Sequence, residues 1–421
     1  MSMPENNNDK KNLVANFFSL SALQGVNMIL PLVTLPYLVR VLGVENFGLL
    51  NFSLSIIMYF NILISFGFEL SATREVSVNR DNIEKVSEIF SSILAIKLFF
   101  VLVSLIILSI LIATIDRLNE NADLYYVTFG LVIGNSLFSS WFFQGMEKMK
   151  YITYINVASK IFFTLFIFIL VKEAEDIIVV AALTSLGAIV SGVYSLRLVV
   201  KLFKLKIIIP DKSIILHQIK GSYHFFLSGV ASKGYRFYII TIVGVYFDNI
   251  IVGYYVMAEK LLYAFLSIGS VVSQTLYPYM SRTKNLVFFK KVFILILIVS
   301  IIIIISVMAF NKPLLKFVFE VESTILSNIF LLIFSGAIFG VIGALIGYPL
   351  LAALGHSREA NNSLIIASAL GIIYTTVITV FFNSIYLLSF AAVVFPVTLM
   401  LLRVYFVYKT DILKSKYPTS K

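Results

Sequence analysis

Three cations that lie inside apolar segments are the residues of this sequence best suited to chemistry. Lys233, Arg236 and Lys260 occur within the stretch Gly221–Arg282, which is otherwise largely apolar. A charge at the centre of a membrane span costs roughly 2.5–3.5 kcal/mol on insertion scales, so it is rarely left facing lipid. Lys233 and Arg236 are three residues apart and share one helix face. These cations indicate a wet interior that receives an anionic ligand, although a salt bridge to Glu259 or snorkelling to the interface is the alternative.

A polar stripe follows on the next predicted helix. Tyr263, Ser267, Ser270 and Gln274 recur at spacings of four, three and four residues, which places them on one helix face. Lys260 precedes the stripe by one turn, and pairing with an acid is the alternative to ligand binding there. The stripe either lines a lumen or forms hydrogen bonds between helices, and both interpretations stay open.

Two further lysines and two carboxylates complete the set of charged candidates. Lys97 and Lys160 are candidate ligands for the anion, with snorkelling or structural pairing as the alternative. Glu69 and Glu259 are candidates for coupling transport to H⁺ or Na⁺, with structural pairing, for instance of Glu69 with Arg74, as the alternative.

Arg40 and Asp248 fall at the outer ends of predicted spans, where they would act as outer-gate or topology residues. Gly43, Gly48 and Gly145 are expected at tight turns or close helix contacts rather than at a ligand, and so is Gly355.

The composition is that of an integral membrane protein. The chain has 421 residues, of which 59% are hydrophobic and 13% charged, with a mean hydropathy of +0.96; a soluble protein has about a quarter charged residues. The net charge of +11 comes mostly from segments that flank the spans, which indicates membrane topology and contact with acidic lipids rather than nucleic acid. Because Cys is absent, disulfides and thiol chemistry are excluded.

A membrane span needs about twenty apolar residues, and on this basis the sequence predicts twelve spans. Lys and Arg concentrate in the segments on the side of the N-terminus, so both termini are expected in the cytoplasm of a bacterium, with a multi-pass chain in its cytoplasmic membrane. Tyr125 and Tyr126 at one end of the fourth span, and Trp141 to Phe143 at the other, are expected to form interfacial aromatic belts. The predicted spans are 13–38, 47–72, 88–114, 124–144, 151–171, 177–199, 222–246, 250–278, 287–310, 325–352, 362–382 and 385–408.

A weak internal repeat organises these spans into halves. Residues 41–48 resemble residues 242–248, and residues 145–149 resemble residues 355–359. Six spans return the chain to the same side, so the halves are expected to be parallel repeats. The sequence therefore predicts an all-α membrane protein with an N-terminal lobe at 1–206 and a C-terminal lobe at 207–421 around a central lumen. The basic segment 198–220 would join the lobes as a surface helix, and Pro349 would bend the tenth span.

Sequence motifs for enzymatic chemistry are missing. The chain has neither a P-loop nor a His-Glu-x-x-His or Gly-x-Ser-x-Gly motif, and its three His are scattered, so neither ATP hydrolysis, a metal centre nor a catalytic triad is expected. A two-lobed bundle with a polar interior and no catalytic motif is typical of a secondary transporter and not of an enzyme.

Several stretches carry a resemblance to a known family. Residues 35–48 (LPYLVRVLGVENFG) and 66–75 (FGFELSATRE) resemble the amino-terminal signature of Wzx-type flippases of O-antigen and polysaccharide units. Further similar stretches are 141–151 (WFFQGMEKMKY), 253–260 (GYYVMAEK) and 274–278 (QTLYP). The resemblance implies the multidrug/oligosaccharidyl-lipid/polysaccharide exporter (MOP) fold, like that of MATE transporters, with lobes that rock to give alternating access.

The resemblance also implies a substrate and partners. The substrate would be an oligosaccharide on undecaprenyl pyrophosphate, moved to the periplasmic leaflet, and the partners would be membrane lipids and the polymerase and chain-length regulator of the same pathway. No cofactor is expected beyond a coupling H⁺ or Na⁺. A cation-coupled multidrug exporter of the same superfamily is the alternative, and a polysaccharide polymerase or ligase is a more distant one.

Overall fold

Helices make up all the regular structure over residues 7–412, the part of the chain that the computed structural model describes. Its description of side chains covers residues 25, 30, 31 and those from 33 onward other than 228 and 232. A helix satisfies its backbone polar groups within one segment, which hydrocarbon requires. The predicted all-α class is therefore confirmed.

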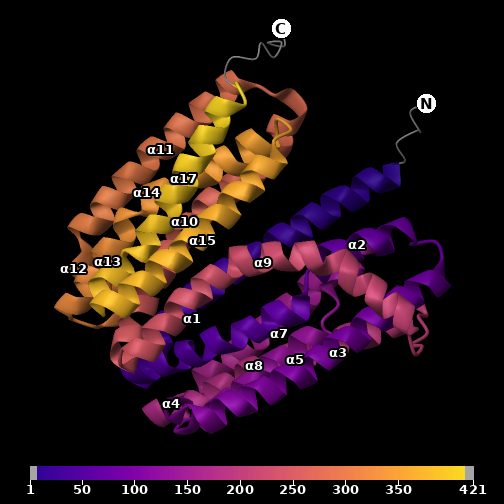
Figure 1. Cartoon of the computed structure of the whole chain (residues 1–421), viewed down its shortest axis with the longest axis horizontal. Helices are drawn as coiled ribbons and strands as arrows, with labels where there is room; N and C mark the ends of the chain where they lie inside the picture. Colours follow the sequence, from indigo (N-terminus) through magenta and orange to yellow (C-terminus); the bar gives the residue numbers. More distant parts are fainter. Residues whose placement is uncertain (1–6, 413–421) are drawn as a thin grey trace. The chain divides into compact units, whose positions relative to one another are not determined.

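The described chain forms two compact units, which Figure 1 colours along the sequence. The first unit contains the chain up to Gly43 and Ser53–Gly234, and the second contains Val44–Phe52 and the chain from Tyr235 onward. The lobe division at residue 206 stays a prediction. Helices α1 (Asn7–Ser65) and α9 (Lys212–Tyr246) each contribute residues to both units.

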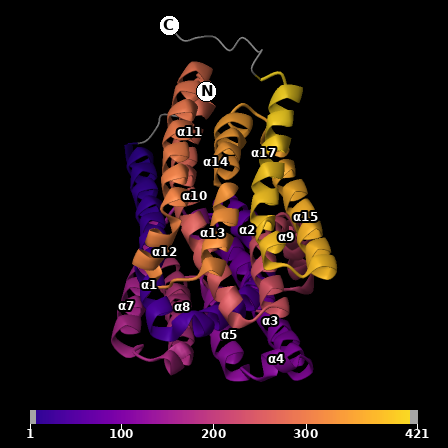
Figure 2. The same cartoon turned by 90° about the vertical axis from the view of Figure 1, so that its left-hand side faces the viewer.

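The other helices divide between the units. Those of the first unit are α2 (Phe68–Val78), α3 (Ile83–Thr114), α4 (Asp116–Asn119), α5 (Ala122–Leu137), α6 (Ser140–Gly145), α7 (Lys150–Leu170), η1 (Ala174–Asp176) and α8 (Ile177–Phe203). Those of the second unit, several of which Figure 2 views from another side, are α10 (Asn249–Thr283), α11 (Leu286–Ala309), α12 (Asn311–Phe319), α13 (Thr324–Ser335), α14 (Ala337–Ile346), η2 (Gly347–Ala352), α15 (Ser357–Phe382), α16 (Ile385–Ser389) and α17 (Ala391–Lys409).

Ten helical segments among the described residues are long and apolar enough to cross a membrane. The chain is therefore a multi-pass membrane protein, and the count of twelve spans stays a prediction. The predicted span 222–246 coincides with the second part of α9, which is not among the ten. The ten are Val33–Val78, Ile83–Thr114, Ala122–Gly145, Lys150–Leu170, Ala174–Phe203, Asn249–Thr283, Leu286–Ala309, Thr324–Ala352, Ser357–Phe382 and Ile385–Lys409.

Glycines mark the turns and close contacts, as the sequence predicts. At Gly43 the backbone leaves helical geometry (φ 75°, ψ 165°) and divides α1 into two helices, and Gly355 has a φ of 100°; both lie where a side chain would be strained. A Cβ at Gly48 would overlap the backbone carbonyl that opens α10, and one at Gly145 would press on side-chain atoms of α2. All four glycines are structural.

The core of the first unit corrects the predicted aromatic belts. Trp141, Phe142 and Phe143 are at most 2% exposed and Tyr125 is fully buried, whereas Tyr126 is exposed as predicted. The three α6 aromatics pack with Phe90 of α3 and with α2 in one apolar cluster. Because α6 is a short helix that turns back into the unit, the aromatic run faces protein instead of the membrane interface.

The predicted surface helix in the basic link is also wrong as a separate element. Helix α8 ends at Phe203, residues 204–211 are not helical, and the segment from Lys212 belongs to α9, which continues without interruption to Tyr246. The segment 212–246 contains no Pro, and an isolated glycine such as Gly221 is tolerated inside a helix, so the amphipathic start and the apolar part form one helix.

In the second unit, a π-helical turn interrupts one of the spans. The segment η2 follows α14 directly and contains Pro349, which lacks a backbone N–H and cannot continue the regular hydrogen-bond ladder. Pro349 therefore lies where the regular α-helix of the tenth predicted span is interrupted, as its missing N–H predicts. The turn places Gly347 against α17, where a Cβ would overlap the guanidinium of Arg403.

Candidate functional site

A cavity of about 560 Å³ lies within the second unit, bounded by α9, α10, α14, α15 and α17. Its lining along α10 runs from Tyr255 to Gln274, a helical distance of about 28 Å. The hydrocarbon core of a bilayer is about 30 Å thick, so the cavity follows most of one span. Its walls are largely apolar and carry a few polar groups, as small-molecule sites do.

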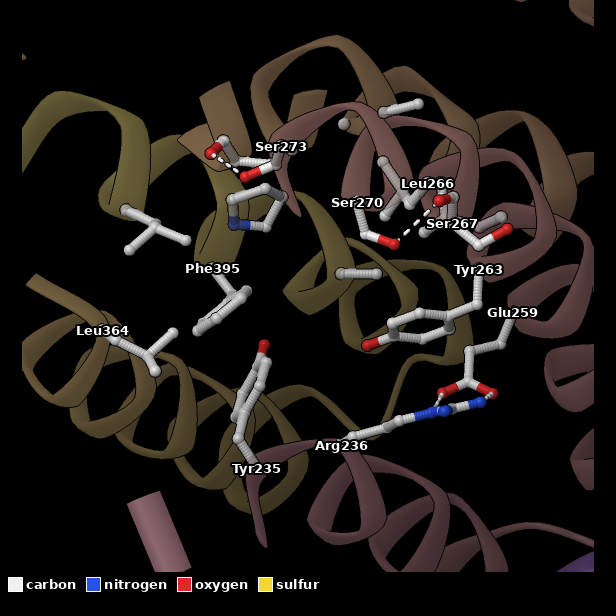
Figure 3. Close-up of a pocket in the computed structure, with 18 of the residues that line it drawn as sticks. Tyr235, Arg236, Glu259, Tyr263, Leu266, Ser267, Ser270, Ser273, Leu364 and Phe395 are labelled. Atoms are coloured by element: carbon white, nitrogen blue, oxygen red, sulfur yellow. Dashed lines mark hydrogen bonds and ion pairs between the residues drawn. The ribbon is translucent and has the colours of Figure 1, made fainter. Parts of the chain in front are cut away.

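Arg236 and Glu259 form an ion pair in the wall of this cavity (Figure 3). Nε of Arg236 donates to Oε1 of Glu259 over 2.7 Å, and Nη2 donates to Oε2 over 3.0 Å. The Glu259 side chain is only 4% exposed, while that of Arg236 is 34% exposed. This bidentate geometry is the strong form of a charge-assisted pair, and it realises the salt bridge that the sequence left open as an alternative.

The ring of Tyr263 packs against the same guanidinium. Its ring centroid lies 3.9 Å from Cζ of Arg236, within the range of a cation–π interaction. Arg236 lies on α9, whereas Glu259 and Tyr263 lie one turn apart on α10. The pair therefore connects two helices, and no second carboxylate among the described side chains pairs with Arg236.

The predicted polar stripe lies along the cavity wall. Tyr263, Ser267, Ser270 and Gln274 all line it. Ser267 Oγ donates to Ala264 O over 2.6 Å. Ser270 Oγ donates to Ser267 O over 2.7 Å (Figure 3), and both bonds lie within α10. These bonds stay within one helix, so the hydroxyl oxygens keep acceptor capacity for a ligand.

Arg403 of α17 is a second guanidinium in the lining, and the sequence interpretation missed it. It lies near the end of the last predicted span, 385–408, where a cation that flanks the membrane is expected, yet it is buried at 5% exposure. It donates to Gly343 O over 2.6 Å, to Ser363 Oγ over 3.2 Å and to Ala360 O over 3.4 Å. All three acceptors are neutral.

Lys233 lies in the first unit, not beside Glu259. Its Nζ pairs with Oε2 of Glu69 over 3.2 Å, and both side chains are more than half exposed. Glu69 thus pairs with Lys233 of α9 and not with Arg74 as predicted. Lys97 of α3 also lies in the first unit and is buried.

Comparison with known proteins identifies the chain's relatives. The family model described as "Polysaccharide biosynthesis protein" matches residues 13–284. The chain belongs to this family. A protein of Escherichia coli (strain K12) named "Putative O-antigen transporter" is 30% identical over 295 residues, which are 68% of this chain and 70% of the relative. A protein of the same name from Shigella dysenteriae is 27% identical over 67% of this chain and 70% of its own.

Solved structures show that this polysaccharide biosynthesis family member has the MOP fold. The lipid II flippase MurJ, in an inward closed conformation, matches with a TM-score of 0.69 at 18% identity over 96% of this chain and 89% of its own. An inward-facing MATE multidrug transporter of the MOP superfamily matches with a TM-score of 0.65 at 10% identity over 92% of this chain and 96% of its own. At these identities the likeness concerns the fold.

The remaining candidates of this family member lie away from the cavity. Lys260 is half-buried and is not in the lining. Lys160 is exposed and lines a separate cavity of about 310 Å³ in the first unit, beside Asn135 and Asn156. Whether these lysines bind a ligand stays a prediction.

The two predicted gate residues are both exposed. The Asp248 carboxylate accepts a hydrogen bond of 2.8 Å from the backbone N–H of Ile251 and caps the start of α10, which gives it a structural role. Arg40 lies just before the break at Gly43. Over residues 7–412, no group of three or more His, Asp or Glu side chains is placed to hold a metal ion.

Proposed function

We propose that this chain is a flippase that moves an oligosaccharide linked to undecaprenyl pyrophosphate from the cytoplasmic to the periplasmic leaflet of a bacterial cytoplasmic membrane. Family membership, relatives named as O-antigen transporters and the fold shared with a lipid II flippase support this proposal. In it both termini face the cytoplasm, and the protein is a transporter without enzymatic activity.

The observation that carries the proposal is the charge of the cavity wall. The lining contains two guanidiniums, Arg236 and Arg403, and one carboxylate, Glu259. The surplus of positive charge favours an anionic ligand. A pyrophosphate joined to sugars needs such a site, because burying its charges and hydroxyls without partners in hydrocarbon is prohibitive.

The neighbouring side chains suit the rest of the head group. Serine hydroxyls and the Gln274 amide can exchange hydrogen bonds with sugar hydroxyls, and the Tyr263 ring offers an apolar face. The polyprenyl tail would stay in lipid while the head group crosses, by alternating access of the two lobes. Glu69 of the first unit, whose ion pair with Lys233 is exposed, is the carboxylate where H⁺ or Na⁺ would couple, whereas Glu259 is held by Arg236.

The test is complementation of a strain that lacks its own flippase for the same polysaccharide. The Ala variants of Arg236 and Arg403, the two cations of the lining, are expected to abolish surface polysaccharide at normal protein level, with the lipid-linked intermediate retained in the cytoplasmic leaflet. Arg358→Ala, which removes an exposed Arg outside the cavity lining, is the matched control. Normal polymer in both variants would defeat the site assignment.

The same strains separate this proposal from a drug exporter. An exporter of cationic drugs would require a surplus of carboxylates in its lumen, the reverse of this lining. We therefore expect no change in drug susceptibility when the gene is depleted. A multidrug-sensitive strain with intact polysaccharide would overturn the flippase proposal.

A further inference from the structure

We propose that Arg403, rather than Arg236, makes the principal charged contact to the diphosphate of the transported lipid. This inference rests on the proposed function and names the residue that receives the anion. It depends on three features of Arg403: its burial without a counter-ion, its unused N–H groups and its position along the cavity.

Among the side chains that the structure describes, no carboxylate pairs with Arg403. Its side chain is 5% exposed, and its three hydrogen-bond partners are two backbone carbonyls and the hydroxyl of Ser363. A buried charge without a counter-charge is costly. A ligand that supplies negative charge at this point would remove that cost, and a pyrophosphate does so with geometry that a guanidinium fork matches.

The guanidinium of Arg403 has N–H donors that the described residues do not use. Arginine carries five N–H donors, and Arg403 directs one each from Nε, Nη1 and Nη2 to the protein. Each terminal nitrogen therefore keeps one N–H that no described residue accepts, and Arg403 lines the cavity. The three occupied donors hold the fork in place, so that little side-chain freedom is lost when an anion binds.

Arg236 is less suited to be the primary anion contact. Its two bonds to Glu259 neutralise its charge, so an incoming phosphate meets a pair with no net charge and is repelled by the carboxylate at close range. Arg236 can still donate hydrogen bonds to the head group. The net positive charge of the lining therefore belongs to Arg403.

The position of Arg403 fits the first encounter with substrate. It lies six residues before the end of α17, a helical distance of about 9 Å. Arg236 lies ten residues before the end of α9, about 15 Å from it. In the predicted topology this end of α9 is the outer one, so Arg236 lies near the middle of its span. With cytoplasmic termini, as proposed, Arg403 lies at the cytoplasmic side of the cavity, where a lipid-linked precursor made in the cytoplasm would enter, and Arg236 lies deeper.

The chain supplies a matched set of variants. Arg403→Met removes the charge, and Arg403→Lys keeps the charge but loses the fork. Gly347→Ala keeps the arginine, but its added Cβ would overlap the guanidinium, which is the movable end of a flexible side chain, so the fork must shift. Arg236→Met tests the competing residue, and Arg358→Met removes an exposed arginine outside the lining.

The experiment measures binding of farnesyl diphosphate to the purified full-length protein in lipid nanodiscs, with farnesol as the tail-only probe. Arg403→Met is expected to weaken diphosphate binding by about tenfold to a hundredfold, the range for loss of a charged hydrogen-bond partner. Arg403→Lys and Gly347→Ala are expected to weaken binding to a smaller degree, Arg358→Met not at all, and farnesol should bind all variants alike.

Each other outcome has one meaning. If Arg403→Met and Gly347→Ala bind the diphosphate like wild type while Arg236→Met does not, the inference is wrong and the proposed flippase function stands. If Arg403→Met does not fold, Gly347→Ala and Arg403→Lys decide: wild-type affinity in both overturns the inference. If wild type binds neither farnesyl diphosphate nor undecaprenyl pyrophosphate, the proposed function itself fails.

Discussion

Two cations of helix α9 form ion pairs that differ in burial and in the number of contacts. Lys233 and Arg236 lie three residues apart on α9, yet Lys233 pairs with Glu69 in the first unit and Arg236 with Glu259 in the second. The Lys233–Glu69 pair has one contact of 3.2 Å, and its side chains are 55% and 54% exposed. The Arg236–Glu259 pair has two contacts, and its carboxylate is 4% exposed.

The difference shows that depth along a helix does not determine what a charge does. Both cations looked equivalent in the sequence because they share a face and a depth. Burial of the partner carboxylate separates them: a buried acid needs its cation permanently, whereas an exposed acid can release it at little cost. We infer that the Arg236–Glu259 pair is a fixed part of the second unit and that the Lys233–Glu69 pair can open.

The largest expected effect is loss of the buried pair's cation. Arg236→Met leaves Glu259 buried without a counter-charge, and breaking such a pair costs about 3–5 kcal/mol. Because Arg236 itself is one third exposed, we expect a loss near the lower end, about 3 kcal/mol. The free energy of unfolding in mixed detergent micelles measures it. A loss below about 1 kcal/mol, the range of exposed pairs, would contradict the proposed contrast.

The double variant Arg236→Met, Glu259→Met should recover most of that loss. An apolar pair of similar volume commonly replaces a buried ion pair without net destabilisation, so we expect a coupling energy of about 2 kcal/mol or more, within the range for contacting residues. The same unfolding measurement on the two single variants and the double variant gives this energy. Additive losses would mean that Glu259 depends on groups other than Arg236.

The sequence predicts some of the features behind this contrast and not others. The all-α membrane class, the cations within spans and the pairing of Arg236 with Glu259 as one alternative all followed from hydropathy and helical spacing. These features depend on the identity and depth of a residue, which the sequence contains directly. The turn at Gly43 and the helix interruption at Pro349 were predictable for the same reason, since their backbone preferences are intrinsic.

The features that the sequence could not reveal depend on which face a helix turns inward. Arg403 lies within two turns of the end of α17, where a flanking cation and a buried one have the same pattern. Trp141 and its neighbours form an aromatic run that suits an interface as well as a core, and only the short helix α6 directs it inward. Both outcomes are decided by packing partners far away in the chain.

A smaller effect is expected from the exposed pair. Lys233→Met should change the free energy of unfolding by about 1 kcal/mol or less if the pair faces water, because exposed ion pairs contribute little. High salt should reduce the difference from wild type, since screening acts on exposed charges. A loss as large as that of Arg236→Met would show that Lys233 and Glu69 lie in a low-dielectric environment, and the comparison between the pairs would collapse.

The smallest effect is expected at a pair outside the membrane spans. Lys316 at the end of α12 pairs with Glu322, and both side chains are about two thirds exposed. The hydrogen bond and charge of Lys316 lower the pKa of Glu322, and those of Glu322 raise the pKa of Lys316.

A carboxyl group with a lowered pKa stabilises the folded state above its unfolded pKa, and this contribution is lost as the pH falls through the folded value. Wild type and Glu322→Gln should therefore differ slightly in melting temperature at neutral pH and converge in acid, in contrast to the Arg236 variants, which should stay destabilised across the neutral range. A large neutral-pH difference for Glu322→Gln would show that exposure is a poor guide to the energy of these pairs, and it would remove the basis on which the two pairs of α9 were distinguished.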